Sequence, residues 1–458
     1  MNVGTHDKQN ENLDKGFGND KGEGSGGNNN ANANGKRMNR RNFLGLAAAV
    51  GTGALATGAL SACSSGQSPA SAPETKVLDL TNWDSILEAA RGTEVHYWSW
   101  AGSDVISGWY NNNLANYLKE NYDVTLKLTG VADTVDTVTQ ISSEMQAGIA
   151  EGSVDFLWVN GENFYTLMQA NYLYGPFTQA LPMNKLLDPL NTNNIYDTAV
   201  QIYGHEASWQ SIYMVFTVDS AKVDFIPKNT DEFLEFCKKY PGKVTYPDVF
   251  DYAGSTIISI FFANILKEED YMKVALDMEL SKEELKNLLE PGLRYLRDLN
   301  PYLWSEGKTF PSNSQGYSQM FSDGELVLGM STNNPKPQVD KGIFPASTRS
   351  FILEKTIQAF YYLAIPKNAT NKAAAMVAIN AMGMPDLQAS DFEVNGFVPV
   401  VDSTRLTEEE QAMFDRIDIG EHWVPVSEME GRTLPLPSGR NIDVITEIWR
   451  EEVVGKTN

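Results

Sequence analysis

Along the chain, the spacing of apolar residues switches between the two-residue period of a strand and the three-to-four-residue period of a helix. Residues 94–100, 124–129 and 154–159 are rich in β-branched and aromatic side chains, and we predict a strand for each. Residues 105–122 and 133–150 lie between them and carry apolar residues at helical spacing. This order of strands and helices predicts a parallel sheet with right-handed crossovers.

A second section after residue 210 alternates in the same way, and we find no internal repeat in it. Pro291-Gly292 is expected to interrupt one of its helices, because proline removes a backbone donor and clashes with the preceding turn. The strands predicted for this section are residues 211–218, 243–246, 325–330 and 359–366, and its helices are residues 230–239, 255–266, 281–297, 371–382 and 441–453.

Ligands of such sheets bind beyond the carboxyl ends of the strands. Residues 98–104 and 160–162 fall at two of those ends. The pattern therefore predicts a small-molecule site formed by the loops that follow the first and third strands.

Length and charge narrow the class of protein. A chain of 458 residues exceeds what one hydrophobic core holds, so we expect two domains. With 36 basic and 59 acidic residues the net charge is -23, which argues against nucleic acid and against docking on anionic lipid through charge. The two cysteines exclude a disulfide framework and a multi-cysteine metal site.

The first 62 residues are typical of an export segment. Met1 to Lys36 is rich in Asn and Gly, and we expect it to be disordered. The basic stretch that follows, and the weakly apolar run Phe43 to Leu60, form the two parts of a secretory signal. Either Met1 or Met38 fits as the start of such a signal.

Two short motifs refine this prediction. Arg40 and Arg41 lie in a stretch that resembles a twin-arginine export signal, with Asn39 where Ser or Thr is usual, and the general secretory route stays open. Leu60-Ser61-Ala62-Cys63 resembles a bacterial lipobox, which implies a diacylglycerol on Cys63. The alternative is a chance thiol behind an ordinary signal peptide. The resemblance implies a protein anchored on the outer face of the cytoplasmic membrane.

Several longer segments resemble the extracellular solute-binding lipoproteins of ABC importers, of the type II periplasmic-binding-protein fold and its YnjB-like branch. The resemblance covers nearly all of the chain after Cys63. It is carried by residues 94–103, 152–164, 203–213, 244–248 and 363–372.

That family implies an α/β fold with two lobes, each a mostly parallel sheet flanked by helices. The first lobe is expected at 93–217 plus 355–396, and the second at 218–354 plus 397–458. Residues 1–62 would be the disordered region and export signal, and residues 63–92 the lipidated tether and a lead-in helix. Ligand would lie in the cleft, hinge closure would trap it, and the closed form would dock on permease subunits.

Aromatic side chains at strand ends and crossovers are candidates for the walls of the cleft. They could stack on a planar ligand or hold a cation over a ring face. Packing in the core or at the hinge is the alternative for each. These residues are Trp100, Trp209, Tyr213 and Tyr361.

Polar candidates follow the same topology. Ser103 and Ser255 open helices whose backbone N–H groups could donate to a ligand, and a simple helix cap is the alternative. The other polar candidates, which could equally be turn or capping residues, are Asn160, Glu162, Asn333 and Asn334.

Metal and cofactor sites are not expected. His205-Glu206 offers one imidazole and one carboxylate, which is too few, and the four histidines are scattered. A lipid-anchored hydrolase with paired carboxylates is the alternative function. A surface adhesion module is a further rival, but it would more often show repeats.

The solute itself is open at this stage. The acidity of the chain, the cleft-edge tryptophans and Glu162 favour a cationic or aromatic-cationic solute, such as a thiamine-like compound or a polyamine. Sugars also stack on tryptophan and stay possible. We expect a monomer.

Overall fold

Three parallel strands form the first part of the fold in the computed structural model, which describes residues 78–429 and 431–454. β1 (Glu94–Trp100) pairs with β2 (Thr125–Val131) on one side and with β3 (Phe156–Val159) on the other. The predicted order of strand and helix is confirmed. The connecting helices are α2 (Asp104–Trp109), which continues through a π-helical turn into α3 (Ala115–Tyr122), and α4 (Thr134–Gln146).

The described residues fall in one compact unit. The predicted lipidation site Cys63 and the export-signal residues Arg40 and Arg41 lie outside them. No helix of the described ranges combines the length and the apolar character that a membrane span requires.

Two long strands carry the sheet from the first section into the second. β6 (Glu206–Asp219) and β9 (Thr356–Ala364) pair antiparallel, and the sheet has the order β2-β1-β3-β9-β6-β7. β7 (Leu328–Ser331) and β8 (Thr348–Phe351) also pair antiparallel with β6, whereas β10 (Thr433–Pro435) pairs parallel with β9, so this part of the sheet is mixed. The α/β fold itself is confirmed.

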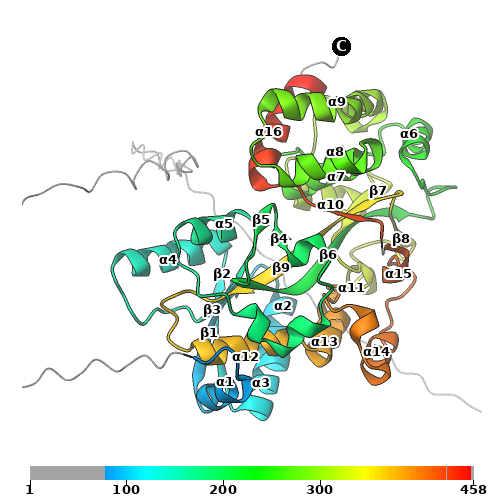
Figure 1. Cartoon of the computed structure of the whole chain (residues 1–458). Coiled ribbons are helices and arrows are strands. Elements are labelled where there is room, and N and C mark those ends of the chain that lie inside the picture. The colour runs from blue at the N-terminus through cyan, green and yellow to red at the C-terminus, as the bar shows by residue number, and fades with distance from the viewer. Residues whose placement is uncertain (1–77, 430, 455–458) are drawn as a thin grey trace, which may run out of the picture. The chain divides into compact units, whose positions relative to one another are not determined.

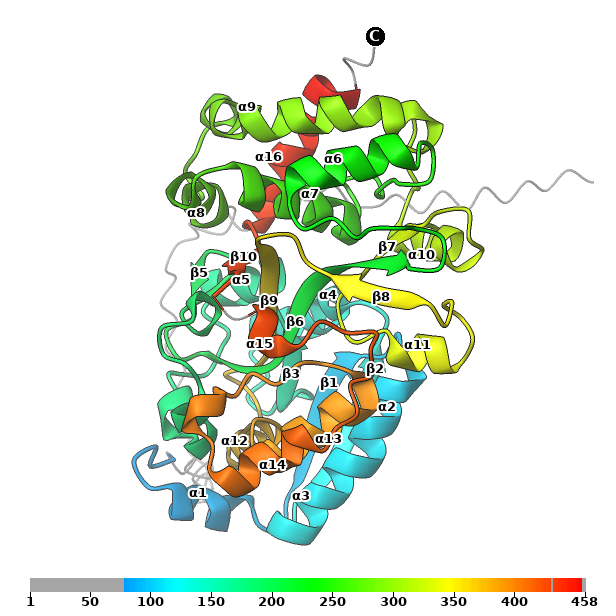
Figure 2. The ribbon, with the colours of Figure 1, turned by 90° about the vertical axis from the view of Figure 1, so that its right-hand side faces the viewer.

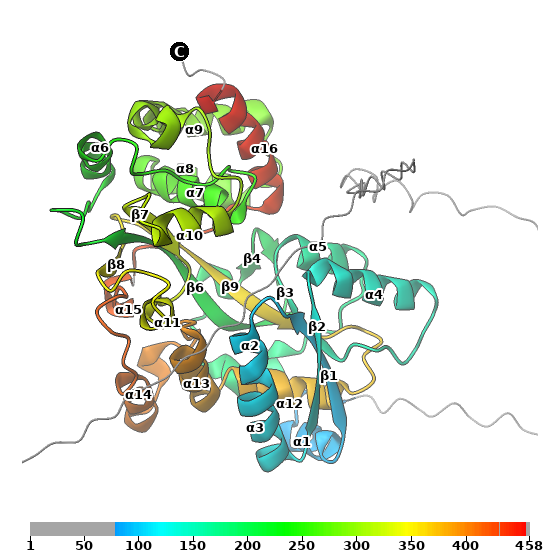
Figure 3. The same cartoon turned by 180° about the vertical axis from the view of Figure 1, so that it is seen from behind.

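Most helices of the second section gather at one end of the unit. Figures 1 and 2 show them beyond the ends of β6 and β9, while β1 to β3 and their helices lie at the opposite end. Figure 3 shows the same division from behind. These helices are α6 (Thr230–Lys239), α7 (Tyr252–Ile265), α8 (Glu268–Leu276), α9 (Lys282–Leu299), α10 (Ser314–Ser322) and α16 (Gly439–Trp449).

The remaining elements cover the first section or link the two. α12 is buried from Ala373 to Met382, because its alanines let it pack closely against α1 and the sheet. The remaining elements are α1 (Trp83–Ala90), α5 (Glu162–Gln169), β4 (Tyr196–Asp197), β5 (Val200–Gln201), α11 (Lys336–Asp340), α12 (Lys372–Met382), α13 (Pro385–Asn395), α14 (Glu408–Asp415), α15 (Val426–Met429) and β10 (Thr433–Pro435).

Two predicted elements were wrong. Residues 244–246 are buried and Lys243 is exposed, but the stretch forms no strand. Its carbonyl oxygens accept isolated hydrogen bonds from the N–H groups of Trp304 and Val327 and belong to no ladder. Pro291 does not interrupt α9, which runs unbroken for 18 residues. The next residue, Gly292, lies so close to the ring of Phe262 that a Cβ would collide with it, so the helix packs tightly against α7 at this point.

Candidate functional site

A cavity of about 430 Å³ lies at the carboxyl ends of β1 and β3. Because these two strands are parallel, the residues that follow them meet at one edge of the sheet. Half of the residues that we predicted to bind ligand line this cavity, together with five others. The lining consists of Trp100, Ser103, Ile106, Thr134, Trp158, Asn160, Thr332, Asn333, Tyr361 and Phe397.

The first section supplies one side of the cavity. Trp100 is the last residue of β1, and Asn160 directly follows β3. Ser103 is the N-cap of α2, where its Oγ accepts a hydrogen bond from the backbone N–H of Ile106 at 3.4 Å. Since the hydroxyl accepts in this bond, its own proton stays available for a ligand.

Later segments of the chain supply the other side. Thr332 and Asn333 follow β7, Tyr361 lies within β9, and Phe397 comes directly after the α13 C-cap. Burial raises the pKa of Tyr361 to about 12, so its hydroxyl stays protonated and can donate a hydrogen bond. Segments far apart in the sequence therefore enclose one space.

Four aromatic rings form a connected wall of the cavity. The ring centroids of Trp100 and Trp158 are 6.0 Å apart with the planes at 86°. Trp158 meets Tyr361 at 4.8 Å and 70°, and Tyr361 meets Phe397 at 5.9 Å and 79°. These edge-to-face contacts fix the rings in place and leave ring faces turned in different directions.

The position of Trp100 depends on a glycine two residues later. A Cβ on Gly102 would collide with the indole of Trp100, which therefore lies directly against the Gly102 backbone. The lack of a side chain at position 102 is thus a condition for this part of the wall.

A buried polar network lies behind Asn333. Asn333 Nδ2 donates to the carbonyl oxygen of Asn395 at 3.0 Å. Asn395 Nδ2 and Gln210 Nε2 each donate to the carboxylate of Asp391 at 2.6 Å. Burial raises the pKa of Asp391 to about 7, while those two hydrogen bonds act in the opposite direction. The network ties the cavity wall to β6 and α13.

Glu162 lies away from the cavity. It is exposed in the first turn of α5, and its Oε2 lies 3.0 Å from the point where a Cβ on Gly439 would stand. Gly439 is the first residue of α16, so this carboxylate faces a helix N-terminus, where negative charge is favourable. No charged side chain is present among the residues that line the cavity.

Two of the predicted aromatic residues are part of the core. Trp209 is 1% exposed and packs against Trp109, Tyr110 and Trp158, so it supports the wall from behind. Tyr213 is 7% exposed and packs in a separate apolar cluster of the core. Neither residue lines the cavity, and for both the packing alternative describes the structure.

The two remaining polar candidates have their groups engaged within the protein. Ser255 lies in the second turn of α7, which begins at Tyr252, and its N–H and hydroxyl bond to carbonyls of the preceding turn. Asn334 Nδ2 donates to the carbonyl oxygen of Ile419 at 2.8 Å, and its Oδ1 accepts from the N–H of Lys336. Both are buried away from the cavity.

Metal ligation finds no support in the geometry. Within residues 78–429 and 431–454, no group of three or more His, Cys, Asp or Glu side chains is arranged to hold a metal ion. What the cavity offers instead is ring faces, hydroxyls and side-chain amides. Such a lining suits reversible binding of a small molecule.

Comparison with known proteins agrees with this arrangement. The model of a family described as bacterial extracellular solute-binding protein matches residues 113–413. Protein YnjB of Escherichia coli (strain K12) is 32% identical over 335 residues, which cover 71% of this chain and 84% of that protein. The chain belongs to the bacterial extracellular solute-binding proteins.

Several solved structures share the fold of this family member. A spermidine/putrescine ABC transporter substrate-binding protein from Streptococcus pneumoniae has a TM-score of 0.57 at 12% identity, covering 78% of this chain and 99% of its own. An ABC transporter from Clostridium perfringens has a TM-score of 0.53 at 16% identity, with the same coverage. The Tp0655 lipoprotein of Treponema pallidum has a TM-score of 0.53 at 15% identity, covering 78% and 98%.

Sequence reasoning missed half of the lining. Trp158 was part of a predicted strand. The strand that forms, β3, has four residues and is buried on both faces, so no alternation of polar and apolar residues marks the face toward the cavity. Thr134 is the first residue of α4 and follows its N-cap Asp133, so the start of the helix predicted for residues 133–150 was the one available signal. Ile106, Thr332 and Phe397 are brought in by tertiary packing, and nothing in their local sequence indicated it.

Proposed function

We propose that this solute-binding protein captures a small solute in the cavity at the ends of β1 and β3 and delivers it unchanged to the permease of an ABC importer. The observation that carries the proposal is the meeting of strand ends. Trp100 ends β1, Asn160 follows β3 and Asn333 lies two residues after β7, and all three line one cavity. A cavity of this kind, with a few polar groups among aromatic side chains, is typical of ligand sites.

The proposal includes two lobes that close on the ligand. Residues 93–217 plus 355–396 would form one lobe, and residues 218–354 plus 397–458 the other. β6 and β9 run between the two groups of helices in Figure 2, which makes this strand pair the natural place for a hinge. A ligand that contacts both lobes would stabilise the closed form over the open form.

The proposed ligand class rests on the residues that line the cavity. A cationic or aromatic-cationic solute fits the aromatic wall, because Trp100, Trp158 and Tyr361 present ring faces that attract a cation without an ion pair. Glu162, which we expected as a charge partner, is not among the residues that line the cavity. A sugar, which needs ring faces and neutral hydrogen-bonding groups, is the second candidate.

The proposed location is the outer face of the cytoplasmic membrane. A lipid on Cys63 would hold the protein there as a monomer, after export by the twin-arginine route. The sequence motifs around Arg40, Arg41 and Cys63 support this part of the proposal. Insertion of acyl chains would supply the anchoring free energy, at about 0.8 kcal/mol per buried CH₂.

The test begins with ligand carried through purification. Mass spectrometry of the small molecules released from denatured protein identifies the solute, and calorimetry then gives its affinity. At saturation, small-angle scattering should show a smaller radius of gyration, and the solute should be recovered unaltered. An unchanged scattering profile would contradict lobe closure, and conversion of the solute would favour the hydrolase alternative.

A further inference from the structure

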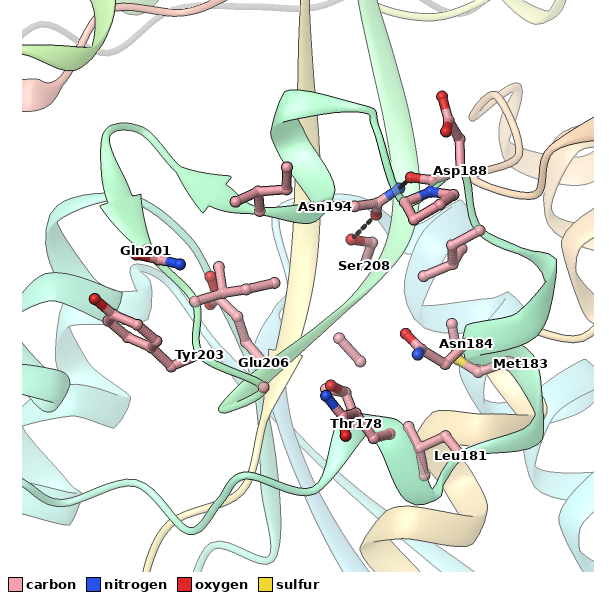
Figure 4. Close-up of a pocket in the computed structure, with 17 residues that line it drawn as sticks. Thr178, Leu181, Met183, Asn184, Asp188, Asn194, Gln201, Tyr203, Glu206 and Ser208 are labelled. Atoms are coloured by element: carbon pink, nitrogen blue, oxygen red, sulfur yellow. Dashed lines mark hydrogen bonds between the residues drawn. The ribbon is translucent and has the colours of Figure 1, made fainter.

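A second cavity, of about 290 Å³, lies beside the start of β6. It shares no lining residue with the cavity described above. Figure 4 shows Glu206 and Gln201 on one side of it, and Asn184 and Leu181 on the other. Its lining is Thr178, Gln179, Leu181, Met183, Asn184, Leu187, Asp188, Pro189, Asn194, Ile195, Gln201, Ile202, Tyr203, Gly204, Glu206, Ala207 and Ser208.

One buried carboxyl in this lining lacks any partner. Glu206 is 0% exposed, and neither Oε1 nor Oε2 has a hydrogen-bond partner among the described residues. A buried polar group without a partner is costly, and a buried charge far more so. Such a group in a native structure indicates that something else satisfies it, such as a ligand or an ion.

The charge around the cavity has one sign. Its lining contains the carboxyls of Asp188 and Glu206 and no Lys, Arg or His side chain. Its remaining polar groups are neutral, and one pair is already ordered, with Ser208 Oγ donating to Asn194 Oδ1 at 2.7 Å. A ligand that donates hydrogen bonds and carries positive charge would satisfy the carboxyl oxygens and the neutral hydrogen-bond acceptors of this lining.

Part of the lining is apolar. Leu181, Met183 and Leu187 come from the 178–190 segment, and Ile195 and Ile202 from the hairpin of β4 and β5. The volume exceeds what a bare ion would fill. The described residues also offer no cluster of three or more His, Cys, Asp or Glu side chains for a metal. The space therefore suits a cation with a hydrocarbon part.

We propose that this cavity is a second binding site, for a short-chain primary alkylammonium ion whose ammonium group donates to the Glu206 carboxylate. The hydrocarbon part would lie against Leu181 and Leu187. The site is independent of the proposed function, because it uses different residues and does not require lobe closure.

Binding at this site is coupled to proton release. Burial raises the pKa of Glu206 well above its ordinary value, and repulsion from Asp197 raises it further. Besides Asp197 of β4, the hydroxyl of Tyr362 of β9 interacts electrostatically with Glu206, and Asp188 and Tyr203 line the cavity. An ammonium ion that pairs with the carboxylate must therefore displace a proton that Glu206 holds more tightly than an ordinary carboxyl group does. Affinity should rise with pH.

The test uses butylammonium chloride as the probe, with calorimetry of the whole protein in two buffers of different ionisation enthalpy. We expect saturable binding that releases protons and is tighter at pH 8 than at pH 6.5. Glu206→Gln should weaken it by about 30-fold or more, as when one partner of a buried charged pair is removed. Potassium chloride and butanol should not compete.

A second variant guards against a folding effect of Glu206→Gln. Asn184 is exposed and points into the pocket in Figure 4, so Asn184→Phe should fill the space without disturbing the core, and it should also abolish binding. Unchanged binding in both variants would overturn the proposal, and so would equal competition by potassium ion. Loss of butylammonium binding in Trp100→Ala, with retention in Glu206→Gln, would assign the probe to the first cavity instead.

Discussion

The indole of Trp158 meets the phenol ring of Tyr361 edge-on, with 4.8 Å between the ring centroids. One residue belongs to β3 and the other to β9, so the contact joins two strands that lie about 200 positions apart in the chain. Trp158 also touches Trp100 and Trp209. The aromatic wall of the cavity is thereby continuous with the core. Substitutions that move a ring of the wall should lower ligand affinity, and substitutions that remove a core residue behind the wall should lower stability.

Gly102→Ala should lower ligand affinity without removing any group that touches the ligand. The added methyl group would occupy space that the Trp100 indole holds, and the indole must turn away. We expect a loss of about 0.5–2 kcal/mol of binding free energy, the range of a ring contact with a ligand cation. Calorimetry with the ligand recovered from the protein measures it.

Gly108→Ala is the matched control, because a Cβ at that helical position meets nothing within 4 Å. It should leave affinity unchanged and stabilise α2 slightly, since alanine is the better helix former. Equal affinity in both alanine variants would show that Trp100 does not contact the ligand.

Trp209→Ala should act on stability first. The side chain is 1% exposed and packs against three aromatic neighbours, so its removal leaves a large void. We expect the free energy of unfolding to fall by about 3–5 kcal/mol in urea titrations. Leu190→Ala, at a residue 84% exposed, should change it by less than about 0.5 kcal/mol. A stable Trp209→Ala protein with weakened binding would instead place Trp209 at the ligand.

Glu162→Gln should bind the ligand with full affinity. Its carboxylate lies next to the first residue of α16 and outside the cavity, so loss of its charge removes no ligand contact. Calorimetry decides between this expectation and an ion pair with a cationic solute. A loss of about 2–5 kcal/mol would restore Glu162 to the site, because that is the effect of breaking a desolvated charged pair.

Asp391 should make stability depend on pH. Its folded-state pKa of about 7 lies above the ordinary value of 3.8, so the folded protein holds this proton more tightly than the unfolded chain. The stabilisation of the folded state that this proton contributes is fully present below about pH 4 and is lost as pH rises through 7. In urea titrations between pH 5 and 8, the free energy of unfolding should fall less steeply with pH for Asp391→Asn than for the native protein.

The control for this experiment is Asp136→Asn, at an exposed position of α4. Its pH dependence should follow that of the native protein. Burial also raises the pKa of Asp197 to about 7 and raises the pKa of Glu206. These two groups should therefore maintain part of the fall in unfolding free energy with pH in the Asp391→Asn variant. Identical slopes for Asp391→Asn and the native protein would mean that Asp391 stays ionised in the folded state.

Cys63→Ser should release the protein from the membrane fraction, because the thiol is the proposed point of lipid attachment. The double substitution Arg40→Lys with Arg41→Lys should block export if the twin-arginine route is used. Fractionation followed by immunoblotting measures both effects. Retention of the Cys63→Ser protein on membranes would exclude the lipid anchor, and normal export of the double variant would favour the general secretory route.

The sequence predicted those cavity residues whose place depends on topology. Trp100 and Asn160 end neighbouring parallel strands, and parallel strand ends meet whatever else the chain does. Ser103 was recognisable as a helix cap from residue type alone. For such positions, local pattern and a simple rule of sheet geometry were sufficient.

Other positions depend on details that no local pattern carries. The β6 ladder shifts register between Ser208 and Gln210, and the residue between them, Trp209, is buried in the core. Every residue of β6 is buried, so alternation could not separate its two faces. Glu162 starts a helix as its position suggested, but its carboxylate faces a helix more than 270 positions later, which only the tertiary fold determines.

The antiparallel pairing of β3 with β9 affects how the protein can be made. Leu157 pairs with Ala364, so during synthesis one edge of β3 has no partner until the later strand has left the ribosome. An unpaired strand edge is a template for wrong pairing and aggregation. Contacts this distant in sequence also form slowly. Completion of this sheet is therefore a late event that requires most of the chain, and the newly made first section is a natural client for a chaperone in the meantime.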